Sequence, residues 1–178
     1  MIYNSLIVPH FNYCILTWGS KVLAGHKLHL LQKKALRIIS NSDFIAHTEP
    51  ICKQMKILKV TDMFRSSILK LYYKLMNNLL PPYFEVMKPK LLNICHYHFI
   101  RKPIYHLPAI KHEFAEQLLE FCLINILNHE HGSVLITSKV HTHSFLGYKL
   151  YLKQRVVDSY VDHCNIPFCE SCRRVEFA

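Results

Sequence analysis

The chain has 178 residues, 51% of them apolar, which is enough for a substantial core in one domain or two small ones. Glycine is scarce, with 4 residues, and this argues against an all-β fold that needs a turn after every short strand. Lysine and arginine outnumber aspartate and glutamate by 22 to 12, so the formal net charge of +10 indicates a polyanionic partner, with nucleic acid ahead of an acidic membrane surface.

The N-terminal part of the chain predicts helices in succession. Residues 2–18 are apolar and aromatic, and we expect two short helical pieces with a bend at Pro9. Because they stand in an apolar run, Tyr3, Tyr13 and Trp18 are predicted to pack in the core rather than to stack on bases. The clearest helical pattern runs over residues 24–40, and the turn formers Asn41-Ser42-Asp43 end it. Its apolar side chains recur at three- and four-residue steps and are predicted to form one buried face: Leu28, Leu31, Ala35, Ile38 and Ile39.

Two further helices are predicted before residue 84. Thr48 is a suitable N-cap for a short helix that runs to about Met55. Thr61 or Asp62 begins a longer helix, which Asn77-Asn78 and the following proline pair end.

The second half is less regular. Residues 88–110 contain a cysteine, histidines and three prolines and are expected to form an extended linker. Residues 111–129 predict a helix, Val134–Ile136 a short strand, and Ser144 an N-cap for a last helix that ends near Val161.

These elements predict a mainly α protein. We expect a helical bundle over residues 1–87, the linker over 88–110, and a smaller α or α+β region over 111–178 that ends in a cysteine-rich tail.

The acidic residues do not predict a catalytic centre. A two-metal nucleotidyl transferase needs clustered carboxylates that hold Mg²⁺ against the triphosphate. The four aspartates are scattered, and only Asp158 and Asp162 lie close together, four residues apart on a predicted helix. The glycines are isolated, so neither a P-loop nor a dinucleotide-binding fingerprint is present. We therefore expect no catalytic residue in this chain.

The cysteines predict an intracellular protein, nuclear or cytoplasmic. Their number, 7, is odd, and the first four are scattered over apolar stretches, which is typical of reduced thiols rather than of a disulfide framework. Near the C-terminus the spacing is compatible with a tetrahedral Zn²⁺ site formed by four ligands: His163, Cys164, Cys169 and Cys172. The alternative is a tail of free thiols, because adjacent His163 and Cys164 are awkwardly placed to share one ion.

Basic residues provide the candidate nucleic-acid contacts. Those of the 24–40 helix fall on the face beside the apolar one, and two more lie in the linker: Lys27, Lys33, Lys34 and Arg37, with Arg101 and Lys102. Such side chains contact phosphates without reading the base sequence. The alternative is an ordinary solvated helix face.

Several blocks in the first half occur in an order that resembles one family. They are Tyr3-Asn-Ser-Leu-Ile-Val-Pro-His-Phe-Asn-Tyr-Cys14 with Trp18-Gly19, Leu30-Leu-Gln-Lys-Lys-Ala-Leu-Arg-Ile-Ile39, Ala46-His-Thr48 with Pro50, and Asn77-Asn-Leu-Leu-Pro-Pro-Tyr83. Together they are similar to the reverse transcriptases of jockey-type non-LTR (LINE-type) retrotransposons, transposable elements in which this stretch follows the palm and opens the thumb. The resemblance covers residues 1 to about 84 and then thins, although Phe114–Asn125 and the cysteine-rich end are also similar to the family.

The resemblance implies a C-terminal fragment of an RNA-directed DNA polymerase. Its thumb would lie beside an RNA/DNA template–primer, and the matching residues are Lys33, Lys34 and Arg37. The catalytic aspartates and their Mg²⁺ belong to the palm, which precedes these blocks, so the chain is expected to be inactive alone. Its partners would be the template–primer and the missing palm and fingers, with no membrane. The alternatives are a stand-alone basic nucleic-acid-binding module with a zinc-binding tail, or a non-functional product of a decayed element.

Overall fold

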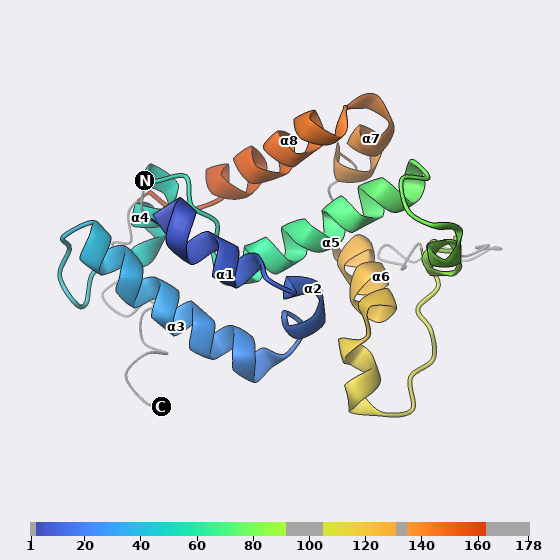
Figure 1. The fold of residues 1–178 in the computed structure, drawn as a ribbon, viewed down its shortest axis with the longest axis horizontal. Helices are drawn as coiled ribbons and strands as arrows, with labels where there is room; N and C mark the ends of the chain where they lie inside the picture. Colours follow the sequence, from blue (N-terminus) through green and yellow to red (C-terminus); the bar gives the residue numbers. More distant parts are fainter. Residues whose placement is uncertain (1–2, 92–104, 131–134, 163–178) are drawn as a thin grey trace, which may run out of the picture. The chain divides into compact units, whose positions relative to one another are not determined.

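The computed structural model describes residues 3–91, 105–130 and 135–162 (Figure 1). Over these ranges the chain is mainly helical and contains no strand, which confirms the predicted fold class. In chain order the elements are η1 (Tyr3–Ile7), α1 (Val8–Asn12), α2 (Ile15–Trp18), α3 (Val22–Ile39), α4 (Thr48–Gln54), α5 (Val60–Met76), η2 (Pro82–Met87), η3 (Glu113–Gln117), α6 (Leu119–Glu130), α7 (Leu135–Thr142) and α8 (Phe145–Asp158). None of the helices in these ranges is long and apolar enough to cross a bilayer.

The chain divides into two compact units. The first consists of the described residues of Met1–Phe64 and Tyr151–Ala178, and the second of those of Arg65–Leu150. The boundaries therefore fall inside α5 and α8.

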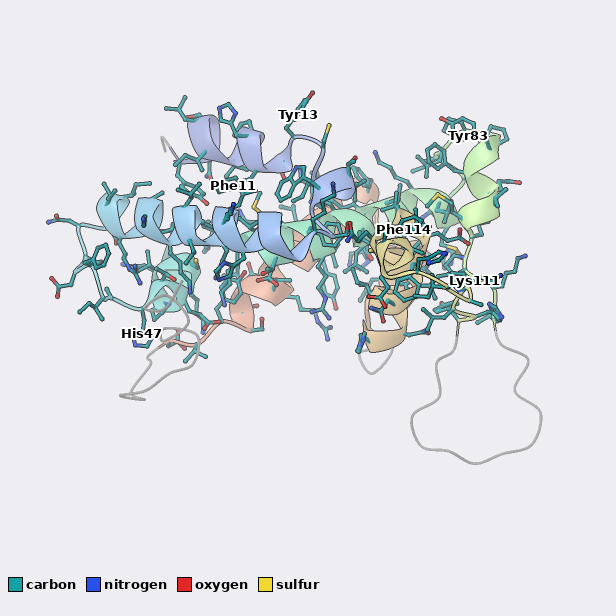
Figure 2. The ribbon with its side chains drawn as sticks, turned by 90° about the horizontal axis from the view of Figure 1, so that it is seen from below. Phe11, Tyr13, His47, Tyr83, Lys111 and Phe114 are labelled. Carbon is teal, nitrogen blue, oxygen red and sulfur yellow. The ribbon has the colours of Figure 1, made fainter. Side chains whose placement is uncertain are left out.

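The first unit contains two groups of buried side chains. One group combines the N-terminal segment, α3, α4 and the end of α8: Tyr3, Leu36, Ile51, Cys52, Ile57, Val157 and Tyr160. The other lies where α1 and α2 meet the start of α5: Phe11, Ile15, Val60 and Met63. In Figures 1 and 2, α1 runs alongside α3, and Phe11 points into the space between them. Residues at both ends of the sequence thus stabilise α3.

A buried glutamine connects three segments of this unit. The Nε2 amide of Gln32 donates hydrogen bonds to the hydroxyl of Tyr3 and to the carbonyl oxygen of Leu58, both at 2.8 Å. Its Oε1 accepts a hydrogen bond from the backbone N–H of Val60 at 2.9 Å. Since a buried amide must be hydrogen-bonded to avoid a desolvation penalty, Gln32 fixes the register between α3, the N-terminal segment and the start of α5.

The break between the N-terminal helical pieces lies further along the chain than the sequence predicts. The predicted bend at Pro9 is wrong, because Pro9 lies in the first turn of α1 and the preceding η1 is wound as a wider π turn. The break falls at Cys14, which has a φ of 49° and immediately precedes α2. A proline is tolerated in the first turn of a helix, where its missing N–H removes no essential hydrogen bond.

Within the described residues, the helices α3, α4 and α5 end in the same way. Asn41 after α3, Lys56 after α4 and Asn78 after α5 all have a φ of 50° to 54°. Beyond each of them, a backbone N–H donates to the carbonyl five residues back: Ser42 to Arg37, Ile57 to Cys52 and Leu79 to Lys74. A left-handed residue followed by this bond is the Schellman motif, which asparagine favours more than most residues do. The predicted stops at Asn41 and Asn77-Asn78 are therefore confirmed.

The inward face of α3 differs from the predicted one. Leu31 is 56% exposed and Ile38 79% exposed, whereas Gln32 and Leu36 are buried. The prediction that Leu31, Ile38 and Ile39 are core residues is wrong, because Ile39 is also exposed, at 45%. The helix is rotated so that Gln32 can form its three hydrogen bonds and Leu36 can pack with Tyr3.

The second unit is organised around aromatic side chains. The ring of Tyr73 on α5 stacks on that of Tyr148 on α8 with a centroid distance of 4.9 Å. Its hydroxyl donates to the carbonyl oxygen of His143 at 2.7 Å. On α6, Leu123 and Leu127 are fully buried.

Two sequence predictions in this unit need correction. The predicted strand at Val134–Ile136 is wrong, because Leu135 and Ile136 begin the helix α7. Periodicity does not distinguish a strand from a helical turn over so short an apolar run. The helix predicted over residues 111–129 divides into the 3-10 turn η3 and then α6. Ser144 caps α8 as predicted, since its Oγ accepts the N–H of Gly147 at 3.3 Å.

The ends of the predicted linker are held together. Leu91 pairs with Tyr105 in an isolated antiparallel bridge, and the N–H of His106 donates to the carbonyl of Lys90 at 2.9 Å. The side-chain amide of Asn128 on α6 bonds both the N–H and the carbonyl of Tyr105, at 3.0 and 3.1 Å. Residues 92–104, between these ends, lie outside the described part of the chain.

Candidate nucleic-acid interface

The N-terminal region of the chain carries positive charge without any acidic residue. The first acid in the sequence is Asp43, and the preceding residues include five lysines or arginines, four of which lie on α3. A polyanion that approaches this region therefore meets no repulsive side chain from α3 itself.

The four basic residues of α3 differ in exposure. Lys27 and Lys34 are exposed, whereas Lys33 is half-buried and takes part in interactions within the protein. Arg37 is only 8% exposed. The exposed basic face thus consists of two lysines rather than the predicted four residues.

Arg37 has a structural role at the end of α3. Its Nε donates to the carbonyl oxygen of Ala46 at 2.9 Å, and its guanidinium lies over the ring of Phe44 at 5.9 Å from the centroid. The side chain therefore holds the loop of residues 41–47 against α3. These contacts with the following loop explain why an arginine predicted to face a phosphate backbone is buried.

Lys33 lies close enough to His29 to affect its protonation. Burial, together with the positive charges of Lys33 and Lys59, lowers the pKa of His29 to about 4. His29 is consequently neutral at physiological pH and adds no charge to α3. The positive charge available to a ligand on this helix comes from its lysines.

Exposed apolar side chains lie beside the exposed lysines, although the sequence did not predict them at the surface. Leu31 and Ile38 follow Lys27 and Lys34 on the same side of α3, and Phe44 and Ile45 are exposed in the loop that follows. A signal was present in the sequence: positions 27, 31, 34 and 38 follow the steps of four, three and four that place residues on one helical stripe. Because Lys34 lies between Leu31 and Ile38 on this stripe, core positions for those two residues would bury Lys34 as well.

A second polar cluster joins the end of α8 to α4 and α5. The hydroxyl of Tyr160 donates to Asp62 at 2.5 Å and accepts the N–H of Lys59 at 3.1 Å. The ammonium group of Lys59 pairs with Glu49 at 2.7 Å. Burial and the bond to Asp62 raise the pKa of Tyr160, so this hydroxyl stays protonated. These groups satisfy one another and hold the end of α8 in place.

The other aspartates near the end of α8 are also engaged in local contacts. Asp162 pairs with Lys53 at 2.8 Å, and Asp158 accepts a hydrogen bond from Gln154 at 2.8 Å. Among the residues that the structure describes, no group of three histidine, cysteine or acidic side chains is arranged to hold a metal ion.

Several predicted site residues lie outside the described ranges. These are the linker residues Arg101 and Lys102 and the candidate zinc ligands His163, Cys164, Cys169 and Cys172. Of the cysteines within the ranges, Cys14 is exposed, while burial raises the pKa of the Cys52 thiol to about 11. Cys52 therefore remains a protonated core side chain.

Tyr13 differs from the two other aromatic residues near the N-terminus that the sequence assigns to the core. Tyr3 is buried and Trp18 half-buried, and the indole N–H of Trp18 donates to the carbonyl of Tyr13 at 2.6 Å. The ring of Tyr13 is exposed and points away from α3 (Figure 2). Its prediction as a core residue is wrong.

Compared with known proteins, the chain matches no family model, no curated protein and no solved structure.

Proposed function

We propose that this chain is the C-terminal part, thumb and beyond, of an RNA-directed DNA polymerase from a jockey-like non-LTR retrotransposon. In this role it binds nucleic acid but contributes no catalytic residue. The observation that carries the proposal is α3, an acid-free helix with Lys27 and Lys34 exposed. Two exposed cations on a rigid helix, in a chain of net charge +10, are suited to phosphate contacts.

The family resemblance supports the proposal through its agreement with the structural elements. The first block spans η1 and α1, and the second lies within α3. The third begins α4, and the fourth covers the left-handed stop at Asn78 and the start of η2. The resembling blocks thus coincide with helices and helix ends, where local sequence is under physical constraint.

The proposal implies partners and a compartment. The palm and fingers of the polymerase would supply the aspartates and Mg²⁺, and the ligand would be an RNA/DNA template–primer inside the cell. Lys27 and Lys34 would contact the phosphate backbone without base specificity. Arg101 and Lys102 are proposed as further contacts.

The experiment is a salt titration of binding to a labelled RNA–DNA hybrid, followed by fluorescence anisotropy. The double variant Lys27→Gln/Lys34→Gln should bind more weakly and reduce the slope of log K against log salt by about 2, since each phosphate contact contributes about 0.9. The matched control is Lys149→Gln/Lys153→Gln, which removes two exposed lysines from α8. Equal losses in both doubles, or no binding of the unaltered chain at low salt, would contradict the proposal.

Zinc analysis separates this proposal from a stand-alone module with a zinc-binding tail. Such a module would hold one zinc ion per chain and lose both the ion and nucleic-acid binding on Cys169→Ser. A thumb that binds through α3 should keep its affinity in that variant.

A further inference from the structure

The outward face of α3 alternates between charged and apolar side chains. In order along the helix it presents Lys27, Leu31, Lys34 and Ile38, all exposed. At about 100° per residue these four positions lie within roughly 60° of one another around the helix axis. The face is therefore a single narrow stripe and not two separate surfaces.

An aromatic ring lies where this helix ends. Phe44 is 74% exposed, and the guanidinium of Arg37 lies over its ring at 5.9 Å. Because Arg37 also bonds the carbonyl of Ala46, the ring is attached to the end of α3 by a fixed cation. Most of the ring remains open to solvent.

We propose that this stripe and Phe44 form a binding site for single-stranded nucleic acid, in which Phe44 stacks on an unpaired base. The inference rests on the proposed nucleic-acid binding and names the form of the ligand. Lys27 and Lys34 contact successive parts of the phosphate backbone, while Leu31 and Ile38 pack against sugars and base faces. Exposed aromatic side chains beside a positively charged track are the usual means of binding single strands without sequence preference.

A duplex, such as the hybrid part of a template–primer, can use the lysines of this surface but gains little from its apolar side chains. Its outer surface offers phosphates and sugars, and its base faces are stacked inside, so Phe44, Leu31 and Ile38 would gain little from it. A single strand exposes base faces beside its phosphates and complements both kinds of side chain.

An anionic membrane is also a poorer partner. A helix that lies on a bilayer separates a continuous apolar face from a basic face. In α3, Lys34 lies between Leu31 and Ile38 on the same stripe, so insertion of the two apolar side chains would draw an ammonium group into the lipid.

The test compares binding of the full chain to three probes at low salt. The probes are a labelled oligouridine or oligothymidine strand, an RNA–DNA hybrid of equal length, and phosphatidylserine vesicles. Phe44→Leu should weaken single-strand binding about tenfold and hybrid binding less than about twofold, because base–aromatic stacking contributes mainly to the former. Phe44→Tyr should restore single-strand affinity.

Phe114→Leu is the matched control, because Phe114 is also an exposed ring that contacts another side chain, stacked at 6.0 Å on His112. It lies in η3 (Glu113–Gln117), away from α3 in the sequence, and is labelled in Figure 2. Its replacement should leave binding of all three probes unchanged.

The outcomes separate this inference from the proposed function. If Phe44→Leu weakens hybrid and single-strand binding equally, or weakens neither of them, the stacking site is wrong. The lysine contacts of α3 are not affected by that outcome. If the chain binds neither nucleic acid at low salt, both proposals fail. If vesicle binding is lost in Phe44→Leu while single-strand binding is retained, the face is a membrane contact and the inference is overturned.

Discussion

The replacement of Gln32 by leucine tests whether one buried amide determines the packing of α3. Leucine has a similar volume and a good helix propensity, so the change removes the hydrogen bonds with little effect on the helix itself. Three partners lose their bond: the hydroxyl of Tyr3, the carbonyl of Leu58 and the N–H of Val60.

The expected loss of stability follows from these partners. Leaving a buried donor or acceptor unsatisfied costs about 1–3 kcal/mol each, and the Tyr3 hydroxyl can partly reorient, so we expect a total of about 3–5 kcal/mol. This is a large fraction of the roughly 5–15 kcal/mol that stabilises a typical domain.

The assay is urea denaturation followed by far-UV circular dichroism, with the midpoint converted to a free energy of unfolding. The matched control is Gln154→Leu on α8, where the exposed glutamine donates to Asp158, and its effect should stay within about 0.5 kcal/mol. A loss in Gln32→Leu below about 1 kcal/mol, or equal to that of the control, would refute the assignment of Gln32 as the connection between α3 and its neighbours.

Two further predictions concern the core. Leu36→Ala should destabilise the chain by about 2–5 kcal/mol, because Leu36 is fully buried. Leu31→Ala should change stability by no more than about 0.5 kcal/mol, because Leu31 is exposed. Equal losses of the two variants in urea denaturation would show that the inward face of α3 is assigned wrongly. Burial, with added hydrogen bonds at Tyr72 and Tyr160, raises the pKa of both hydroxyls, so these side chains stay protonated in the folded chain while the unfolded chain ionises near pH 10. A raised folded pKa contributes stability that is present below the unfolded value and lost above it, so stability should fall by up to about 1.4 kcal/mol per pH unit for each tyrosine above about pH 10. Urea midpoints measured on both sides of pH 10 check this, and Tyr72→Phe/Tyr160→Phe should flatten the decline; an unchanged slope in the double variant would count against these residues as its source.

Local sequence was sufficient to locate most helices and several of their ends. α3, α4, α5 and α8 form where their apolar spacing and turn residues predict them, including the cap at Ser144 and the left-handed stop at Asn41. These features act over a few residues, so they are legible without knowledge of the fold. The predicted cap at Thr48 is wrong, because Thr48 is the first residue of α4 and His47 precedes it without a side-chain cap hydrogen bond. The strand predicted at Val134–Ile136 failed because so short an apolar run has no period of its own.

The candidate site was only partly predictable, because local sequence acts over a few residues and does not determine which side of a helix is exposed. The sequence identified α3 as basic, but it did not determine which basic residues are exposed. Arg37 is buried because Ala46 and Phe44 receive its guanidinium, and both contacts depend on how the following loop returns to the helix. Arg101, Lys102 and the cysteine-rich tail fall outside the described ranges, so their proposed roles stay predictions.

By itself, the sequence determined that α3 is a helix with apolar and basic stripes and no acid. Only the tertiary structure decided which stripe faces inward. The helical period places residues on faces, but a face becomes interior only when other segments pack on it. Here the packing residues lie far from Gln32 in the sequence: Tyr3 is 29 residues away, Leu58 is 26 and Val60 is 28. Those distant partners favour Gln32 and Leu36 inside and leave Leu31 and Ile38 beside the lysines at the surface.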